Sequence, residues 1–70
     1  MIRQNVTSSN IHSVGYDHTS NTLEIAFHNG SIYQYMQVPN AIPLGLLSAG
    51  SKGQYFNQHI KNVYPFIKVA

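Results

Sequence analysis

The chain of 70 residues contains no cysteine. It therefore has no disulfide bond, no thiolate nucleophile and no sulfur-ligated metal. No apolar run approaches the roughly eighteen residues that a membrane-spanning helix needs. The first ten residues, MIRQNVTSSN, contain one arginine and lack the apolar core of a signal peptide. We therefore expect a cytoplasmic protein that does not enter a membrane, folded as a single domain over residues 1–70.

Charged side chains are also scarce. Only 9% of the residues are charged, against about 25% in an average soluble domain. The four basic and two acidic side chains give a net charge of +2 and are Arg3, Lys52, Lys61, Lys68, Asp17 and Glu24. A surface with so few charges is often covered in part by another molecule. A protein partner or a homodimer is therefore one open interpretation.

The dipeptide Asn29-Gly30 lies between two segments of alternating apolar residues. It is typical of a two-residue type I′ hairpin turn, because both central residues of that turn need φ > 0. The register that follows pairs Glu24 with Tyr35 and turns Tyr33 to the same face of the sheet. We therefore expect both tyrosines to be exposed, on the face opposite an aliphatic core.

The segment IHSVGY (11–16) is predicted to form a strand before this hairpin. If residues 18–21 form a four-residue loop, Val14 lies opposite Ile25 and Tyr16 opposite Leu23. The residues then expected on the core face are Val14, Tyr16, Leu23, Ile25, Phe27, Ile32 and Met36. The first ten residues have no clear period, and we expect them to fray.

After Val38-Pro39 the apolar period changes toward that of a helix. A first helix is predicted from an N-cap at Asn40 to Gly50. The pattern Ser51-x-x-Gln54 is a capping box that opens a second helix with an apolar stripe of Phe56, Ile60 and Val63. Pro65 ends it, and residues 66–69 form either a final strand or a tail. The predicted fold is α+β, an antiparallel β-meander of about three strands with two short helices packed on one face.

The two tyrosines carry the main functional hypothesis. Exposed aromatic side chains on a sheet face can stack nucleic-acid bases. Strand propensity alone also accounts for Tyr33 and Tyr35, because tyrosine favours strands and stabilises them in cross-strand pairs. A third possibility is that residues 66–70 fold over both rings. The sequence leaves these three interpretations open.

The corner Ser51-Lys52-Gly53 is a candidate anion site. A helix N-terminus offers free backbone N–H groups and a partial positive charge, and Lys52 would add to it. A capped helix without a ligand is the alternative. The pattern from Gly45 to Lys52 resembles a phosphate-binding loop, but serine and lysine stand in the wrong order and no strand leads into it.

Catalytic and metal chemistry are not indicated. The histidines show no metal-ligand spacing, and the predicted register places His12 and His28 on opposite faces of the sheet. No histidine–carboxylate pair is predicted beside a serine. We therefore predict no catalytic residues, no metal site, no cofactor and no enzymatic activity.

Short motifs spread over the chain occur in one order. They are Ser8-Ser9-x-Ile11, Val14-Gly15-Tyr16-Asp17, Leu23-x-Ile25-x-Phe27, Gly30-x-x-Tyr33-x-Tyr35, Val38-Pro39, Ser51-Lys52-Gly53-x-Tyr55-Phe56-Asn57, Ile60-Lys61 and Tyr64. In these residues the chain resembles the KTSC domain over about residues 6–68. The family is named for its occurrence at the C-terminus of some lysyl-tRNA synthetases and also occurs alone as a small bacterial protein. Its central Tyr-x-Tyr matches Tyr33 and Tyr35.

Attachment to a tRNA synthetase implies RNA as a partner, and no catalytic residues carry over from the family. The leading hypothesis is a module for tRNA or single-stranded RNA, in which Tyr33 and Tyr35 stack bases while Lys52 and Lys61 meet phosphates. The alternative is a protein-interaction or self-association module without catalytic activity, because tyrosine is enriched at such interfaces.

Overall fold

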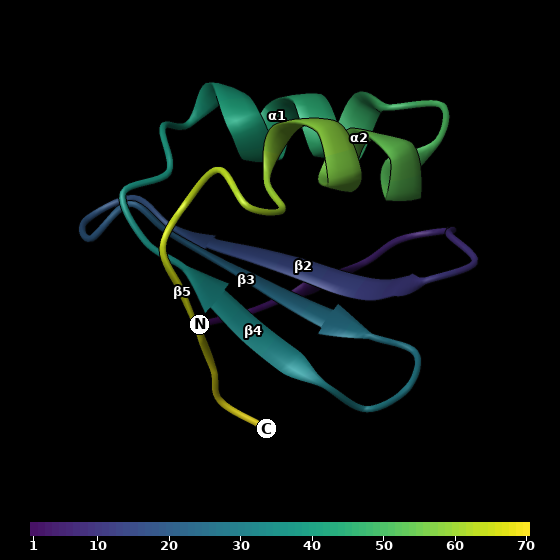
Figure 1. Ribbon diagram of the computed structural model, residues 1–70, viewed down its shortest axis with the longest axis horizontal. Helices are drawn as coiled ribbons and strands as arrows, with labels where there is room; N and C mark the ends of the chain where they lie inside the picture. The colour runs from purple at the N-terminus through teal and green to yellow at the C-terminus, as the bar shows by residue number, and fades with distance from the viewer.

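The structure is a computed structural model that describes residues 1–70. Its elements, in chain order, are β1 (Gln4–Asn5), β2 (Ile11–Asp17), β3 (Thr22–Phe27), β4 (Ile32–Tyr35), α1 (Ala41–Ser48), α2 (Lys52–His59) and β5 (Phe66–Lys68). The strands form one antiparallel sheet in the order β1-β2-β3-β4-β5. Figure 1 shows both helices on one face of this sheet. The α+β class and the two-layer arrangement are confirmed.

The sheet has five strands, so the expected number of about three is wrong. The two additional strands are the short edges β1 and β5, which have two and three residues. Segments this short show no measurable apolar period, and their extended shape follows from pairing with β2 and β4. The expectation that residues 1–10 fray is also wrong, because Gln4 and Asn5 pair with β2. Of the two alternatives for residues 66–69, the final strand is confirmed.

The pairing of β2 with β3 follows the prediction over most of its length. Val14 lies opposite Ile25 and Tyr16 opposite Leu23, so residues 18–21 form the expected loop. The register then shifts at a bulge between Ile11 and Ser13. Ile11, rather than His12, lies opposite Phe27 and is fully buried.

The hairpin between β3 and β4 differs from the prediction by one residue. The amide of Phe27 donates to the carbonyl of Ser31 at 2.8 Å, which closes a three-residue loop over residues 28–30. Gly30 has a φ of 93°, as expected for the left-handed position of such a loop. Tyr35 therefore lies opposite Leu23 and Tyr33 opposite Ile25.

This change turns every side chain of β4 to the other face of the sheet, because strand side chains alternate. Tyr33 and Tyr35 face the helices, and the expectation that they lie on the outside is wrong. Ile32 and Met36, expected in the core, lie on the face away from the helices. There the Thr22 hydroxyl approaches the Met36 sulfur at 3.9 Å.

The core fills the space between the sheet and the helices. Its buried residues are Ile11, Val14, Leu23, Ile25, Tyr35, Val38, Leu46 and Ile60. The capping box is confirmed, because the Ser51 hydroxyl accepts a hydrogen bond from the amide of Gln54. The expected stripe is wrong at Val63: α2 ends at His59, so Val63 lies beyond the helix and is exposed. Neither α1 nor α2 has the length and apolar composition of a membrane-spanning helix.

Candidate functional site

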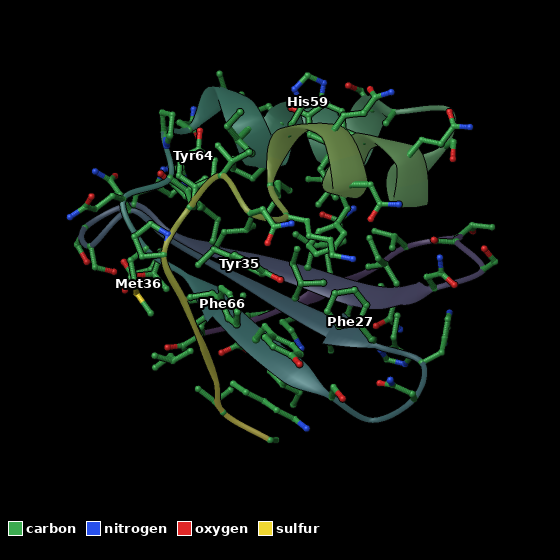
Figure 2. The ribbon with its side chains drawn as sticks, in the orientation of Figure 1. Phe27, Tyr35, Met36, His59, Tyr64 and Phe66 are labelled. Atoms are coloured by element: carbon green, nitrogen blue, oxygen red, sulfur yellow. The ribbon has the colours of Figure 1, made fainter.

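Five aromatic side chains from four elements surround a hollow on the helix-covered side of the sheet. They are Phe27 of β3, Tyr33 and Tyr35 of β4, Phe56 of α2 and Phe66 of β5. Neighbouring ring centroids lie 5.4–6.3 Å apart. The hollow has a volume of about 320 Å³, and its other lining residues are Asn29, Ser31, Lys61 and Asn62. We call it the aromatic hollow; Figure 2 shows three of its residues, Phe27, Tyr35 and Phe66.

The two tyrosines contribute to this hollow from the helix-facing side, and the predicted open platform on the outer face does not exist. Tyr35 is only 4% exposed and Tyr33 is half-buried. Strand β5 lies beside β4, and the ring of Phe66 contacts both tyrosine rings. The C-terminal segment therefore covers part of both rings and forms one wall of the hollow.

The hydroxyl groups of Tyr33 and Tyr35 form no hydrogen bond within the protein, in contrast to that of Tyr16, which donates to the Val38 carbonyl. No fully buried side-chain oxygen or nitrogen lacks a partner, so the Tyr35 hydroxyl reaches solvent. Burial, with the nearby Tyr33 as a smaller cause, raises the pKa of Tyr35 to about 12. Its hydroxyl stays protonated at neutral pH and can donate a hydrogen bond.

The aromatic hollow continues into two further hollows along α2. The next one, of about 420 Å³, shares Phe27, Asn29 and Phe56 with it. A third, of about 370 Å³, shares Ser9, Asn10, Gly53 and Asn57 with the second. We call the three together the α2 groove. It runs from Lys61 at the aromatic end to Lys52 at a polar end.

The polar end contains the predicted corner Ser51-Lys52-Gly53. The Ser51 hydroxyl accepts a hydrogen bond from the Gln54 amide at 3.3 Å. The Lys52 ammonium group donates to the carbonyl of Ala49, the C-cap of α1, at 3.1 Å. Both side chains thus have structural partners, and anion binding here stays a prediction. The structure brings Lys61 to the tyrosines, while Lys52 lies at the other end of the groove.

Neither acidic side chain of the protein lines the α2 groove. Glu24 lies on the opposite face of the sheet, where it pairs with Arg3 and accepts a hydrogen bond from Gln34 at 2.8 Å. The Asp17 carboxylate accepts hydrogen bonds from the hydroxyl and amide of Thr19. The charged side chains of the groove are therefore both lysines, and the groove suits an anionic ligand.

Two histidines that the predicted register separated are in contact. The rings of His12 and His28 pack edge to face with centroids 5.6 Å apart. The β2 bulge and the three-residue hairpin loop change the register on both sides and bring them together. The His28 Nε2 lies 2.9 Å from the Ser8 carbonyl oxygen. No group of three or more potential metal-ligating side chains is present.

Sequence reasoning missed three of the five rings as site residues. Their periodicity predicts Phe27 and Phe56 in the core, and both are only partly buried at its edge. Phe66 was placed in either a strand or a tail, and its contact with the tyrosines depends on pairing with β4. The register of this final strand carries no local signal in the sequence.

Comparison with known proteins gives one consistent result. The model of the KTSC domain family matches residues 7–64. The crystal structure of a KTSC domain protein from Yersinia pestis superposes with a TM-score of 0.93 at 41% identity, covering 99% of this chain and 97% of that one. An uncharacterized protein of Stutzerimonas stutzeri is 41% identical over 61 residues, 87% of this chain and 86% of its own.

A lysine–tRNA ligase of Nostoc punctiforme is also similar. It is 41% identical over 60 residues, which make up 86% of this chain. The matching region spans only 11% of the length of that ligase. The similarity therefore concerns one small part of a much larger enzyme.

Proposed function

The chain belongs to the KTSC domain family, and from this premise we propose that it is a small cytoplasmic RNA-binding module without catalytic activity. The observation that carries the proposal is the α2 groove, which combines aromatic rings with two lysines and has no carboxylate. The relative from Nostoc punctiforme supports RNA as the ligand, because its name assigns it to lysine–tRNA ligation. The RNA would be a tRNA or another RNA with an unpaired segment.

Single-stranded RNA suits the groove better than a duplex does. Proteins that bind single strands combine a cationic groove with aromatic rings, on which bases stack with about 1–3 kcal/mol each. The α2 groove has this composition, with Lys61 beside the rings and Lys52 at its far end. In this proposal Tyr33 and Tyr35 still contact bases, but as walls of a groove rather than as an open surface on the outer face of the sheet.

The expected affinity is modest. Each phosphate that a lysine neutralises contributes about −0.7 to the slope of log K against log salt for a single strand. Two contacts, at Lys52 and Lys61, predict a slope of about −1.4. We expect dissociation constants on the order of micromolar or weaker at physiological salt, because so few phosphates are contacted.

Fluorescence anisotropy with a short, labelled, mixed-sequence RNA tests the proposal. Lys52→Gln together with Lys61→Gln should weaken binding at least tenfold and flatten its salt dependence. Lys68 lies opposite Tyr33 on β5 but does not line the groove, and Lys68→Gln should have a smaller effect. Equal losses in both variants would show that Lys52 and Lys61 are not the main phosphate contacts, and no binding by the unaltered chain at low salt would contradict the proposal.

A protein-interaction or self-association module is the second candidate. The observation that favours it is apolar exposure on the face away from the helices, at Met1, Ile2, Ile67 and Val69. Ile67 lies opposite Gln34, and Ile2 is 95% exposed. Sedimentation velocity over a wide concentration range tests self-association: a mass that rises with concentration and returns to monomer in Ile67→Lys would support it. A constant monomer mass would exclude a homodimer over that range.

A further inference from the structure

We infer that the aromatic hollow holds one unpaired nucleobase of the bound RNA, stacked on Phe66, with its polar edge toward the Tyr35 hydroxyl and its phosphate at Lys61. The inference rests on the proposed function and makes it specific. It assigns the aromatic end of the α2 groove to a base and leaves the polar end to the backbone.

The exposure of the rings indicates where a base can stack. Phe66 is 53% exposed, while Tyr35 is 4% exposed. Phe66 therefore offers an open ring at the rim, and Tyr35 forms the inner end of the hollow. The centroids of these two rings lie 5.8 Å apart and their planes are inclined by 40°. A flat group stacked parallel to Phe66 would therefore be inclined by the same 40° to the Tyr35 ring.

The Tyr35 hydroxyl favours a ligand with a polar edge. Like any tyrosine hydroxyl it is protonated at neutral pH, burial raises its pKa further, to about 12, and no protein atom accepts its proton. An aliphatic side chain in the hollow would remove this hydroxyl from water without giving it a partner, which is unfavourable. A nucleobase presents oxygen and nitrogen acceptors along its edge and satisfies the donor.

The rim provides the remaining contacts of a nucleotide. Lys61 and Asn62 line the hollow directly after α2, and Asn29 lines it from the hairpin loop. The Lys61 ammonium group can meet the phosphate, and the amides can donate and accept hydrogen bonds. No acidic side chain lines the hollow, so none repels the phosphate there. These features favour a base joined to an anion over a neutral or cationic peptide.

NMR titration of the full chain with small probes tests the base separately from the backbone. Adenosine and uridine 5′-monophosphates should shift the aromatic signals of Phe66 and Tyr33 at millimolar concentration. Ribose 5-phosphate, which lacks the base, should leave these signals unchanged. Equal responses to nucleotide and sugar phosphate would overturn the inference. So would a response to an acetylated Phe-Glu peptide but not to the nucleotides.

Two matched variants test the hydroxyl. Tyr35→Phe removes only an oxygen that has no protein partner, so the fold should persist, and nucleotide affinity should fall about threefold to tenfold. Tyr55→Phe makes the same change at a ring that packs on Gly45 of α1, outside the hollow, and should leave affinity unchanged. Equal affinities in both variants would overturn the role of Tyr35. RNA binding that persists in Tyr35→Phe but is lost in the double lysine variant would show that only this inference has failed.

Discussion

The guanidinium group of Arg3 pairs with the carboxylate of Glu24 on the sheet face away from the helices. Residues 1–3 reach this position by crossing Gly15, where an added Cβ atom would lie 2.9 Å from the Ile2 carbonyl oxygen. The N-terminal segment thus covers the centre of the outer face, and Glu24 is only 7% exposed. Its position in β3 places Glu24, one of the two acidic side chains, on the sheet face opposite the α2 groove.

This ion pair predicts a loss of stability in acid. Burial alone would raise the pKa of Glu24, but the hydrogen bonds from Gln34 and Arg3 and the charge of Arg3 hold it below the usual 4.5. A carboxyl with a lowered pKa in the folded state stabilises the protein above about pH 4.5, and this contribution is lost as the pH falls through the lowered value. Glu24→Gln should therefore lower the free energy of unfolding by about 1 kcal/mol at neutral pH. The variant should also lose less of its free energy of unfolding than the unaltered chain does when the pH falls below about 4.

Urea unfolding at neutral pH and at about pH 3 measures this effect. Asp17 is a second carboxyl that can be compared with Glu24, because hydrogen bonds from the Thr19 side chain and backbone also lower its pKa. Asp17→Asn combined with Glu24→Gln should flatten the acid dependence further than either change alone. If the free energy of unfolding of Glu24→Gln fell as steeply toward about pH 3 as that of the unaltered chain, the role assigned to the Arg3–Glu24 pair would be contradicted.

Tyr35 predicts a change at alkaline pH. A tyrosine whose pKa is raised when folded stabilises the protein below its usual value of 10.0, and this contribution is lost as the pH rises toward about 12. The tyrosinate absorbance of the unaltered chain minus that of Tyr35→Phe should therefore titrate near 12. A difference that titrates near 10 would show that the Tyr35 ring is hydrated, and the aromatic hollow would not have the described shape.

The contact between the two helices predicts a cost at Gly45. A Cβ atom there would lie 2.7 and 2.9 Å from two ring carbons of Tyr55. Overpacking costs about 1–3 kcal/mol, and the better helix propensity of alanine offsets up to about 1 kcal/mol. Gly45→Ala should therefore lower the melting temperature by several degrees, about 4–8 °C per kcal/mol in a domain of this size.

Gly50→Ala is the control for this prediction, because a Cβ atom at Gly50 meets nothing within 4 Å. Its melting temperature should stay close to that of the unaltered chain. Replacing Tyr55 by leucine in the Gly45→Ala background should recover part of the loss. An unchanged melting temperature in Gly45→Ala would mean that Tyr55 packs elsewhere.

Local signals in the sequence predicted the helices and one strand pairing well. The Ser51 capping box places the start of α2, and the loop over residues 18–21 places Val14 opposite Ile25. The predicted register of the β3–β4 hairpin was wrong because Asn29-Gly30 is compatible with two loops. One is a two-residue type I′ turn, and the other is a three-residue loop with glycine in the left-handed position. Burial of Tyr35 against the helices distinguishes the two, and this is a tertiary contact.

The candidate site could be predicted only in part for the same reason. Tyr33, Tyr35 and Lys61 are three of the residues predicted to bind RNA, and they line one hollow; their role in binding stays a prediction. Their surroundings depend on β5, a three-residue strand whose pairing with β4 places Phe66 opposite Tyr35. Such a short edge strand is fixed by its partner rather than by its own composition. The aromatic hollow therefore becomes visible only when the chain is folded.

A ¹H–¹⁵N NMR titration with a short single-stranded RNA at low salt tests the central claim most directly. The account predicts shifts that follow the α2 groove from Lys61 and Asn29 through Asn57 to Gly53, and that weaken as salt is added. An unchanged spectrum would contradict it. So would shifts confined to Ser13, Glu24 and Gln34 on the opposite face of the sheet.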